Sequence, residues 1–148
     1  MRLARFIAAG FGTGYAPLAA GTVASAAAVL AGGGLLMWSP WALAFAALIA
    51  TFGGYIAVKR AAIEGDPGWV VIDEFAGQWI TLLALSHPTI PGIIAAFVLF
   101  RLFDITKLGP VGWADRCHGA FGIMADDVIA GIIAAVLLIL IRLAWPAL

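Results

Sequence analysis

Apolar residues occur in long runs along this chain, and compact polar stretches separate the runs. One apolar run extends from about residue 22 to 37 and a second from 41 to 58, with Ser39 and Pro40 between them. Each run is about as long as a thin or closely packed bilayer span, because roughly 20 helical residues cross the hydrocarbon core. Glycines in both runs permit close helix approach. The pattern predicts a tight helical hairpin.

Two shorter apolar runs, 75–85 and 90–100, lie on either side of Ser86-His87-Pro88, with Pro91 close behind. Neither is long enough to span comfortably alone, so they form either a hairpin of short tilted helices or a re-entrant element. The last run, 128–141, is almost purely aliphatic. The expected helices are 22–37, 41–58, 74–86, 90–107 and 127–143. The fold class is therefore all-α: a multi-pass membrane helical bundle with short middle helices, in one domain covering 1–148.

Composition supports a membrane location. Hydrophobic residues make up 64% of the 148 residues and charged residues only 11%, whereas a globular chain has about 25% charged residues. The formal net charge is zero, so nothing favours a nucleic-acid partner. Protein partners are not indicated by any feature of the sequence.

Charged residues concentrate in three stretches: the first five residues, 59–74, and 101–127. Arg142 alone lies outside them. If each apolar hairpin goes out and back, all three stretches reach the same membrane face. Their lysine and arginine content predicts that this face is cytoplasmic.

Two acidic pairs, Asp73–Glu74 and Asp126–Asp127, each precede an apolar run. One interpretation is helix capping, since carboxylates satisfy free N–H groups at helix starts. Capping needs only one carboxylate per helix, however, and paired like charges favour a divalent cation. Mg²⁺ prefers a few carboxylates together with water and substrate phosphate. Two pairs brought together would make a magnesium site suited to phosphoryl chemistry.

Basic and hydroxyl side chains supply the second candidate group. Arg101 and Asp104 share a helix face, with Lys107 one turn on; they form either a local ion pair or a phosphate-binding pair of cations. Thr22 and Ser25 follow a glycine-rich loop. Thr22 is either a plain N-cap or, with Ser25, part of an anion site at the helix start.

Other phosphatase chemistries fit less well. A cysteine-based phosphatase would need an arginine six residues after Cys117, where Ile123 stands. His118 is either a general acid or an ordinary hydrogen-bonded surface residue.

Three blocks of the sequence together resemble the phosphatidylglycerophosphatase A family. They are GTGYAPLAAGTVAS, VIDEFAGQWI and FRLFDITKLGPVGWADRCHGAFGIMADDVIAGI. The resemblance implies Mg²⁺-dependent hydrolysis of phosphatidylglycerophosphate to phosphatidylglycerol at the bacterial inner membrane, with the active site facing the cytoplasm. The chain departs from the family pattern at Ala20, Ala24 and Leu108, which are loop-shaping positions.

Carried onto matching positions, the resemblance gives a polar set that also includes Asp115. The expected metal ligands are Asp73, Glu74, Asp126 and Asp127, with Asp104 as an additional ligand. The expected substrate-binding residues are Thr22, Ser25, Arg101 and Lys107. The expected catalytic residues are Asp73, Asp127, Arg101 and Lys107. Metal-activated water is the preferred nucleophile, and an aspartyl-phosphate intermediate stays an alternative.

Four rival functions are weighed against this one. A CDP-alcohol phosphotransferase needs spaced Asp residues with Ala-Arg, and a PAP2-type phosphatase needs Pro-Ser-Gly-His; neither pattern is present. A transporter or channel would place ionisable groups within the spans, whereas here they lie at the ends of the apolar runs. A scaffold subunit would explain the caps but not the joint pattern of acids and bases.

Overall fold

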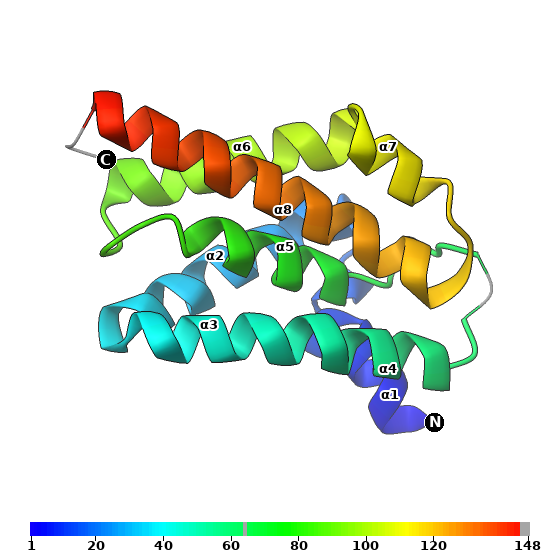
Figure 1. Ribbon diagram of the computed structural model, residues 1–148. Coiled ribbons are helices and arrows are strands. Elements are labelled where there is room, and N and C mark those ends of the chain that lie inside the picture. Colours follow the sequence, from blue (N-terminus) through cyan, green and yellow to red (C-terminus); the bar gives the residue numbers. More distant parts are fainter. Residues whose placement is uncertain (64, 146–148) are drawn as a thin grey trace.

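The computed structural model describes residues 1–63 and 65–145, and these residues form helices without any strand. Three helices are long and apolar enough to cross a membrane: Ala20–Trp38 (α2), the continuous stretch Pro40–Arg60, and Gly119–Ala144 (α8). They lie lengthwise side by side with the shorter helices (Figure 1). The predicted all-α membrane bundle is confirmed.

The predicted hairpin at Ser39-Pro40 is confirmed in detail. Ser39 is extended, with φ −165°, and its side chain accepts a hydrogen bond from the Trp41 N–H at 3.2 Å. Pro40 then starts α3 (Pro40–Leu48), because proline's fixed φ suits the first helical turn. The helix continues through a π-helical turn (η2, Ile49–Gly53) into α4 (Gly54–Arg60).

The middle of the chain forms two helices of unequal length, α5 (Ile72–Leu82) and α6 (Ile90–Thr106). At 11 residues, α5 is about 16 Å long and cannot cross a hydrocarbon core of about 30 Å. It is nevertheless central, since it contacts α2, α3, α6 and α8. Arg142 of α8 donates to the carbonyl of Ala84 and to the Ser86 hydroxyl, which ties the end of α8 to the loop after α5.

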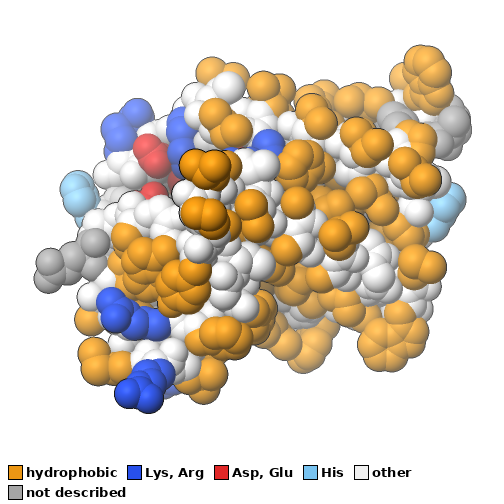
Figure 2. All heavy atoms as spheres, turned by 180° about the vertical axis from the view of Figure 1, so that it is seen from behind, with side chains coloured by type: hydrophobic (Ala, Val, Ile, Leu, Met, Phe, Trp, Pro, Cys, Tyr) orange, Lys and Arg blue, Asp and Glu red, His pale blue; other side chains and the backbone are white. Residues whose placement is uncertain are grey.

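One end of the bundle holds the polar stretches. The N-terminal helix α1 (Arg2–Ala8), the end of α4, the starts of α5 and α8, and α7 (Pro110–Asp115) all lie there, whereas the turns at 39 and 83–89 lie at the other end (Figure 1). Figure 2 shows the acidic and most of the basic side chains of one face near one end, with hydrophobic side chains over the rest. The predicted one-sided placement of charge is confirmed.

The side surface is unusually apolar for a protein exterior. Leu30, Phe45, Phe52 and Val136 are between 54% and 77% exposed. Because a water-facing surface rarely carries so many large apolar side chains over contiguous helices, this surface is suited to lipid.

Two predictions about helix starts are wrong. The last helix begins at Gly119 rather than near 127, so Asp126 and Asp127 lie about two turns inside it and do not cap it. The residues 119–125 are mostly small or apolar and extend the helix over part of the expected polar stretch. Thr22 is not an N-cap either, because α2 starts at Ala20 after Ala19, which has φ +48°.

The closest approach between α5 and α8 is made by two glycines. A Cβ atom added at Gly131 would lie 2.4 Å from the carbonyl oxygen of Gly77, and one added at Gly77 would lie 2.5 Å from the carbonyl oxygen of Asp127. Thr81 strengthens this contact by donating to the carbonyls of Gly77 and Gly131 at 2.9 and 3.2 Å. The two helix backbones therefore touch without intervening side chains.

Candidate active site

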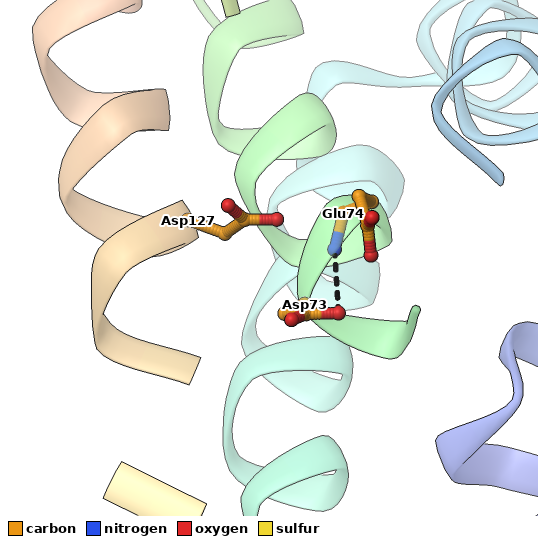
Figure 3. Close-up of side chains that lie close together, drawn as sticks. All are labelled: Asp73, Glu74 and Asp127. Atoms are coloured by element: carbon orange, nitrogen blue, oxygen red, sulfur yellow. Dashed lines mark hydrogen bonds between the residues drawn. The ribbon is translucent and has the colours of Figure 1, made fainter. Parts of the chain in front are cut away.

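Three carboxylates from two helices meet at the polar end of the bundle. Asp73 and Glu74 come from the first turn of α5, and Asp127 projects toward them from α8 (Figure 3). One oxygen atom of each lies within 4.8 Å of the other two. Asp73 is 8% exposed and Asp127 only 2%. The Asp73 carboxylate also accepts a hydrogen bond from the Glu74 N–H at 3.2 Å.

Three negatively charged carboxylates this close together repel one another unless a cation lies between them. Burial, followed by the charges of Glu74 and Asp127, raises the pKa of Asp73 well above its usual range. The Glu74 Oε2 atom is buried and has no hydrogen-bond partner in the described part of the chain. Oxygen ligands on opposite sides of Mg²⁺ are about 4.2 Å apart, because each lies about 2.1 Å from the ion. The cluster therefore fits a small divalent cation after minor side-chain adjustment.

Arg101 of α6 links this cluster to the start of α2. Its Nη1 atom donates to Asp104 and lies 3.9 Å from Glu74 Oε1. Nη1 also approaches the Ser25 hydroxyl, and Nη2 approaches the Thr22 hydroxyl, each at 3.4 Å. The structure thus brings the predicted residues Thr22, Ser25 and Arg101 together next to Glu74. Long contacts of this kind leave the guanidinium able to turn toward an anion.

Lys107, the second predicted phosphate-binding residue, lies among three carboxylates. Its ammonium group donates to Asp126 and lies 3.5 Å from Asp104 and 3.3 Å from Asp115. Three carboxylates therefore surround the ammonium group, Asp126 as its hydrogen-bond acceptor and the other two as ion-pair partners. Burial alone would lower the pKa of Lys107, but the hydrogen bond to Asp126 and the surrounding carboxylates raise it above its ordinary value.

The backbone of Lys107 is adapted to this position. Lys107 ends α6 in the left-handed conformation, with φ +51°. A side chain other than glycine adopts that conformation at an energetic cost, which is often found at functional sites. The turn directs the chain through Gly109 into α7 and brings Asp115 to the ammonium group.

The five predicted metal ligands differ in their neighbours. Asp73, Glu74 and Asp127 lie close together. Asp104, which lies beside Asp127, pairs with Arg101 and Lys107, and Asp126 pairs with Lys107.

A cavity of about 580 Å³ opens beside Asp126. The charged residues Asp66, Asp115 and Arg116 line it, together with His118. The sequence interpretation did not single out Asp66, which lies in the loop before α5. A carboxylate in a charged stretch gives no signal of its own that it faces a cavity.

Two parts of the glycine-rich segment near the N-terminus contact different parts of the structure. The part from Gly10 to Tyr15 (η1) packs on the segment before α5, and a Cβ atom at Gly14 would lie 2.0 Å from the Trp69 carbonyl oxygen. Gly21, in contrast, lies against the site, since a Cβ atom there would be 2.2 Å from Glu74 Oε1. Of these two parts, the one at the start of α2 therefore borders the carboxylate cluster.

The fold and site together define a multi-helix membrane protein with a buried acidic centre, flanked by basic residues, at one end of the bundle. The family model of phosphatidylglycerophosphatase A matches residues 6–142. The chain belongs to the phosphatidylglycerophosphatase A family and is a phosphoric monoester hydrolase.

Individual relatives agree with this membership. The chain is 40% identical to phosphatidylglycerophosphatase A of Escherichia coli over 145 residues, which cover 95% of this chain and 84% of the relative. It is 40% identical to phosphatidylglycerophosphatase A of Haemophilus influenzae over 141 residues, covering 92% and 86%. A Bacteroides thetaiotaomicron relative named "Putative phosphatidylinositol-3-phosphatase" is 37% identical over 145 residues, covering 92% and 91%. No solved structure matches the chain.

Proposed function

We propose that this protein removes the terminal phosphate of phosphatidylglycerophosphate in a Mg²⁺-dependent reaction, giving phosphatidylglycerol and inorganic phosphate. The observation that carries the proposal is the buried cluster of Asp73, Glu74 and Asp127 beside Arg101 at one end of a membrane bundle. Family membership supplies the class of reaction, and the names of the Escherichia coli and Haemophilus influenzae relatives support the headgroup.

The cluster of Asp73, Glu74 and Asp127 would hold the metal ion. Mg²⁺ bound there would polarise the phosphoryl group and lower the pKa of water, which supplies the nucleophile at neutral pH. The surrounding protein excludes bulk water from the cluster, since Asp127 is almost fully buried. In such an environment the attraction between charged groups is stronger than in water.

Arg101 is the residue best placed to bind the phosphate that is cleaved. Its guanidinium group offers planar, paired N–H donors, which match phosphate oxygens. Its Nε atom is buried and has no partner among the described residues. The Thr22 hydroxyl, next to Nη2, would add a donor to the same anion, whereas the Ser25 hydroxyl donates to the Gly21 carbonyl at 2.8 Å and accepts from Nη1.

Lys107 would act mainly as an internal counter-ion. It neutralises part of the charge of Asp104, Asp115 and Asp126, which lie beside the cluster. Without that compensation, the approach of a phosphate dianion to this end of the protein would be repelled more strongly. The role differs from direct phosphate binding, because three carboxylates already surround the ammonium group.

The active site would face the cytoplasm at the bacterial inner membrane. Arg2 and Arg5 of α1 lie at the same end of the bundle as Lys59 and Arg60, which end α4, and α1 and α4 are in contact. Basic residues next to membrane spans favour the cytoplasmic side.

Phosphate release by the purified protein in detergent micelles tests the proposal. Phosphatidylglycerophosphate, phosphatidylinositol 3-phosphate and soluble glycerol 3-phosphate are compared, each with Mg²⁺ and with EDTA. We expect metal-dependent release, fastest from phosphatidylglycerophosphate. Faster release from the inositol lipid would reassign the headgroup, and undiminished release in EDTA would remove the metal from the mechanism.

A matched pair of variants connects activity to the cluster. Asp73→Asn removes one of the three carboxylates, whereas Asp66→Asn removes an exposed carboxylate that lines the neighbouring cavity. We expect the first variant to lose activity and the second to keep most of it. Equal losses in both would show that general negative charge, rather than the cluster, supports the reaction.

A further inference from the structure

Gln78 is a fully buried polar residue whose side chain forms no hydrogen bond within the described part of the chain. Its side chain is 0% exposed, and its Oε1 and Nε2 atoms have no hydrogen-bond partner within the described residues. It lies on the short helix α5, which is surrounded by the other helices of the bundle. A buried amide without partners costs free energy, and in a membrane protein nearby water cannot easily replace the missing bonds.

The position of Gln78 relates it to the acidic cluster. It follows Glu74 by four residues, so both side chains lie on the same face of α5, one turn apart. Among residues 1–63 and 65–145, Glu74 Oε2 is also buried without a partner, and so is Nε of Arg101, whose Nη1 atom lies 3.9 Å from Glu74 Oε1. The same region therefore contains three side chains with unsatisfied polar atoms: an acceptor on Glu74, a donor on Arg101, and one atom of each kind on Gln78.

Thr81, also on α5, shows that burial alone does not explain these atoms. Its side chain is 0% exposed as well, but its hydroxyl donates to the carbonyls of Gly77 and Gly131. The Thr81 hydroxyl therefore satisfies its hydrogen bonds inside the protein. Gln78 does not, which points to a role toward the site rather than toward packing.

We propose that Gln78 is a positioning residue that orients the Glu74 carboxylate, and with it the Arg101 guanidinium, directly or through one bridging water. Gln78 lies one turn further along α5 than Glu74. Its amide can therefore contact the Glu74 carboxylate from the side that faces away from the polar end of the bundle. Groups that orient metal ligands from behind usually affect metal affinity and activity about 10–100-fold. The inference rests on the proposed role of Glu74 in holding the metal.

The test compares Gln78→Leu, Gln78→Asn and Thr81→Val with the wild-type protein in detergent. Three quantities are measured: the Tm in EDTA, the rise in Tm on titration with Mg²⁺, and kcat and KM for phosphate release. Gln78→Leu replaces an unsatisfied amide with an apolar side chain of similar size, so its Tm in EDTA should equal or exceed that of the wild type.

We expect Gln78→Leu to need about tenfold more Mg²⁺ for the same rise in Tm and to lose about 10–100-fold in kcat with a smaller change in KM. Gln78→Asn, which keeps the amide, should recover part of both. Thr81→Val should do the reverse, lowering the Tm in EDTA while keeping kcat per folded molecule.

A lower Tm for Gln78→Leu with unchanged kcat and Mg²⁺ dependence would overturn the inference, because Gln78 would then be structural. Unchanged values of all three quantities would overturn it as well. The Mg²⁺ titration of Tm needs no substrate, so it separates this inference from the proposed reaction. If the wild type released no phosphate but bound Mg²⁺ more tightly than Gln78→Leu, the proposed reaction would fail while the role of Gln78 stood.

Discussion

Replacing Gly131 by alanine should separate the two halves of the acidic cluster. Gly131 follows Asp127 by four residues in α8, and Gly77 follows Asp73 by four residues in α5. The glycine contact therefore lies one turn, about 6 Å, beyond the carboxylates. Because the contact is between two backbones, no flexible side chain is available to move aside.

The size of the effect can be worked out from the contact distance. The added methyl group would lie 2.4 Å from the Gly77 carbonyl oxygen, whereas ordinary contacts begin at 3.4 Å, so the helices must move apart by 1.0 Å. Overpacking of this kind costs about 1–3 kcal/mol of stability, and alanine's better helix propensity returns about 1 kcal/mol. A displacement of about 1 Å at a catalytic site reduces activity roughly a hundredfold.

The assay is phosphate release per folded molecule, together with the Tm in detergent. The control is Gly34→Ala in α2, where a Cβ atom meets nothing within 4 Å. That variant should keep full activity and gain about 0.5–1 kcal/mol from reduced backbone freedom in the unfolded state. Full activity and an unchanged Tm in Gly131→Ala would refute the argument that this contact sets the distance between Asp73 and Asp127.

Three further perturbations have expected outcomes. Asp127→Asn should lower kcat/KM at least about a hundredfold without lowering the Tm in EDTA, because it removes a like charge from the cluster; a loss of Tm would indicate a structural role. Lys107→Met should cost about 3 kcal/mol of stability, because it leaves Asp126 buried without its cation, and thermal unfolding measures this directly. Arg142→Ala should lower the Tm by a few degrees but leave kcat unchanged, since Arg142 acts at the opposite end of the bundle.

Much of the architecture could be predicted from the sequence. Hydropathy alone located the first two spans, because lipid demands long apolar helices. Ser39-Pro40 marked the turn between them through ordinary capping chemistry, and α6 was placed within one residue at each end.

The start of α8 could not be predicted in the same way. Two adjacent aspartates look like the boundary of an apolar helix, yet here they lie inside it because Lys107, from a distant part of the chain, neutralises Asp126. Such compensation depends on tertiary contacts that the pattern of residues does not contain. Polarity along a chain marks helix ends reliably only where charges face water.

The candidate site was predictable in its residue types but not in its pairing. The sequence placed Asp126 and Asp127 in one group, whereas the helix turns them to different partners: Asp127 to the cluster and Asp126 to Lys107. The sequence does contain a pattern that marks Gly77 and Gly131. Each stands four residues after an aspartate in the pattern Asp-x-x-Ala-Gly. That repeat places a close helix contact beneath each carboxylate.

The depth of the cluster has a consequence for how a substrate is found. Asp127 lies about 12 Å along α8 from the helix start, since each residue adds about 1.5 Å. With the polar end of the bundle at the membrane surface, as proposed above, a carboxylate at that depth would be near the level of the lipid headgroups rather than in open water. A phosphorylated lipid can reach it by diffusing sideways within its own leaflet, so the search takes place in two dimensions. A soluble phosphate ester would first have to leave bulk solvent. Lipid substrates would therefore be favoured over soluble ones before the protein makes any contact with the headgroup.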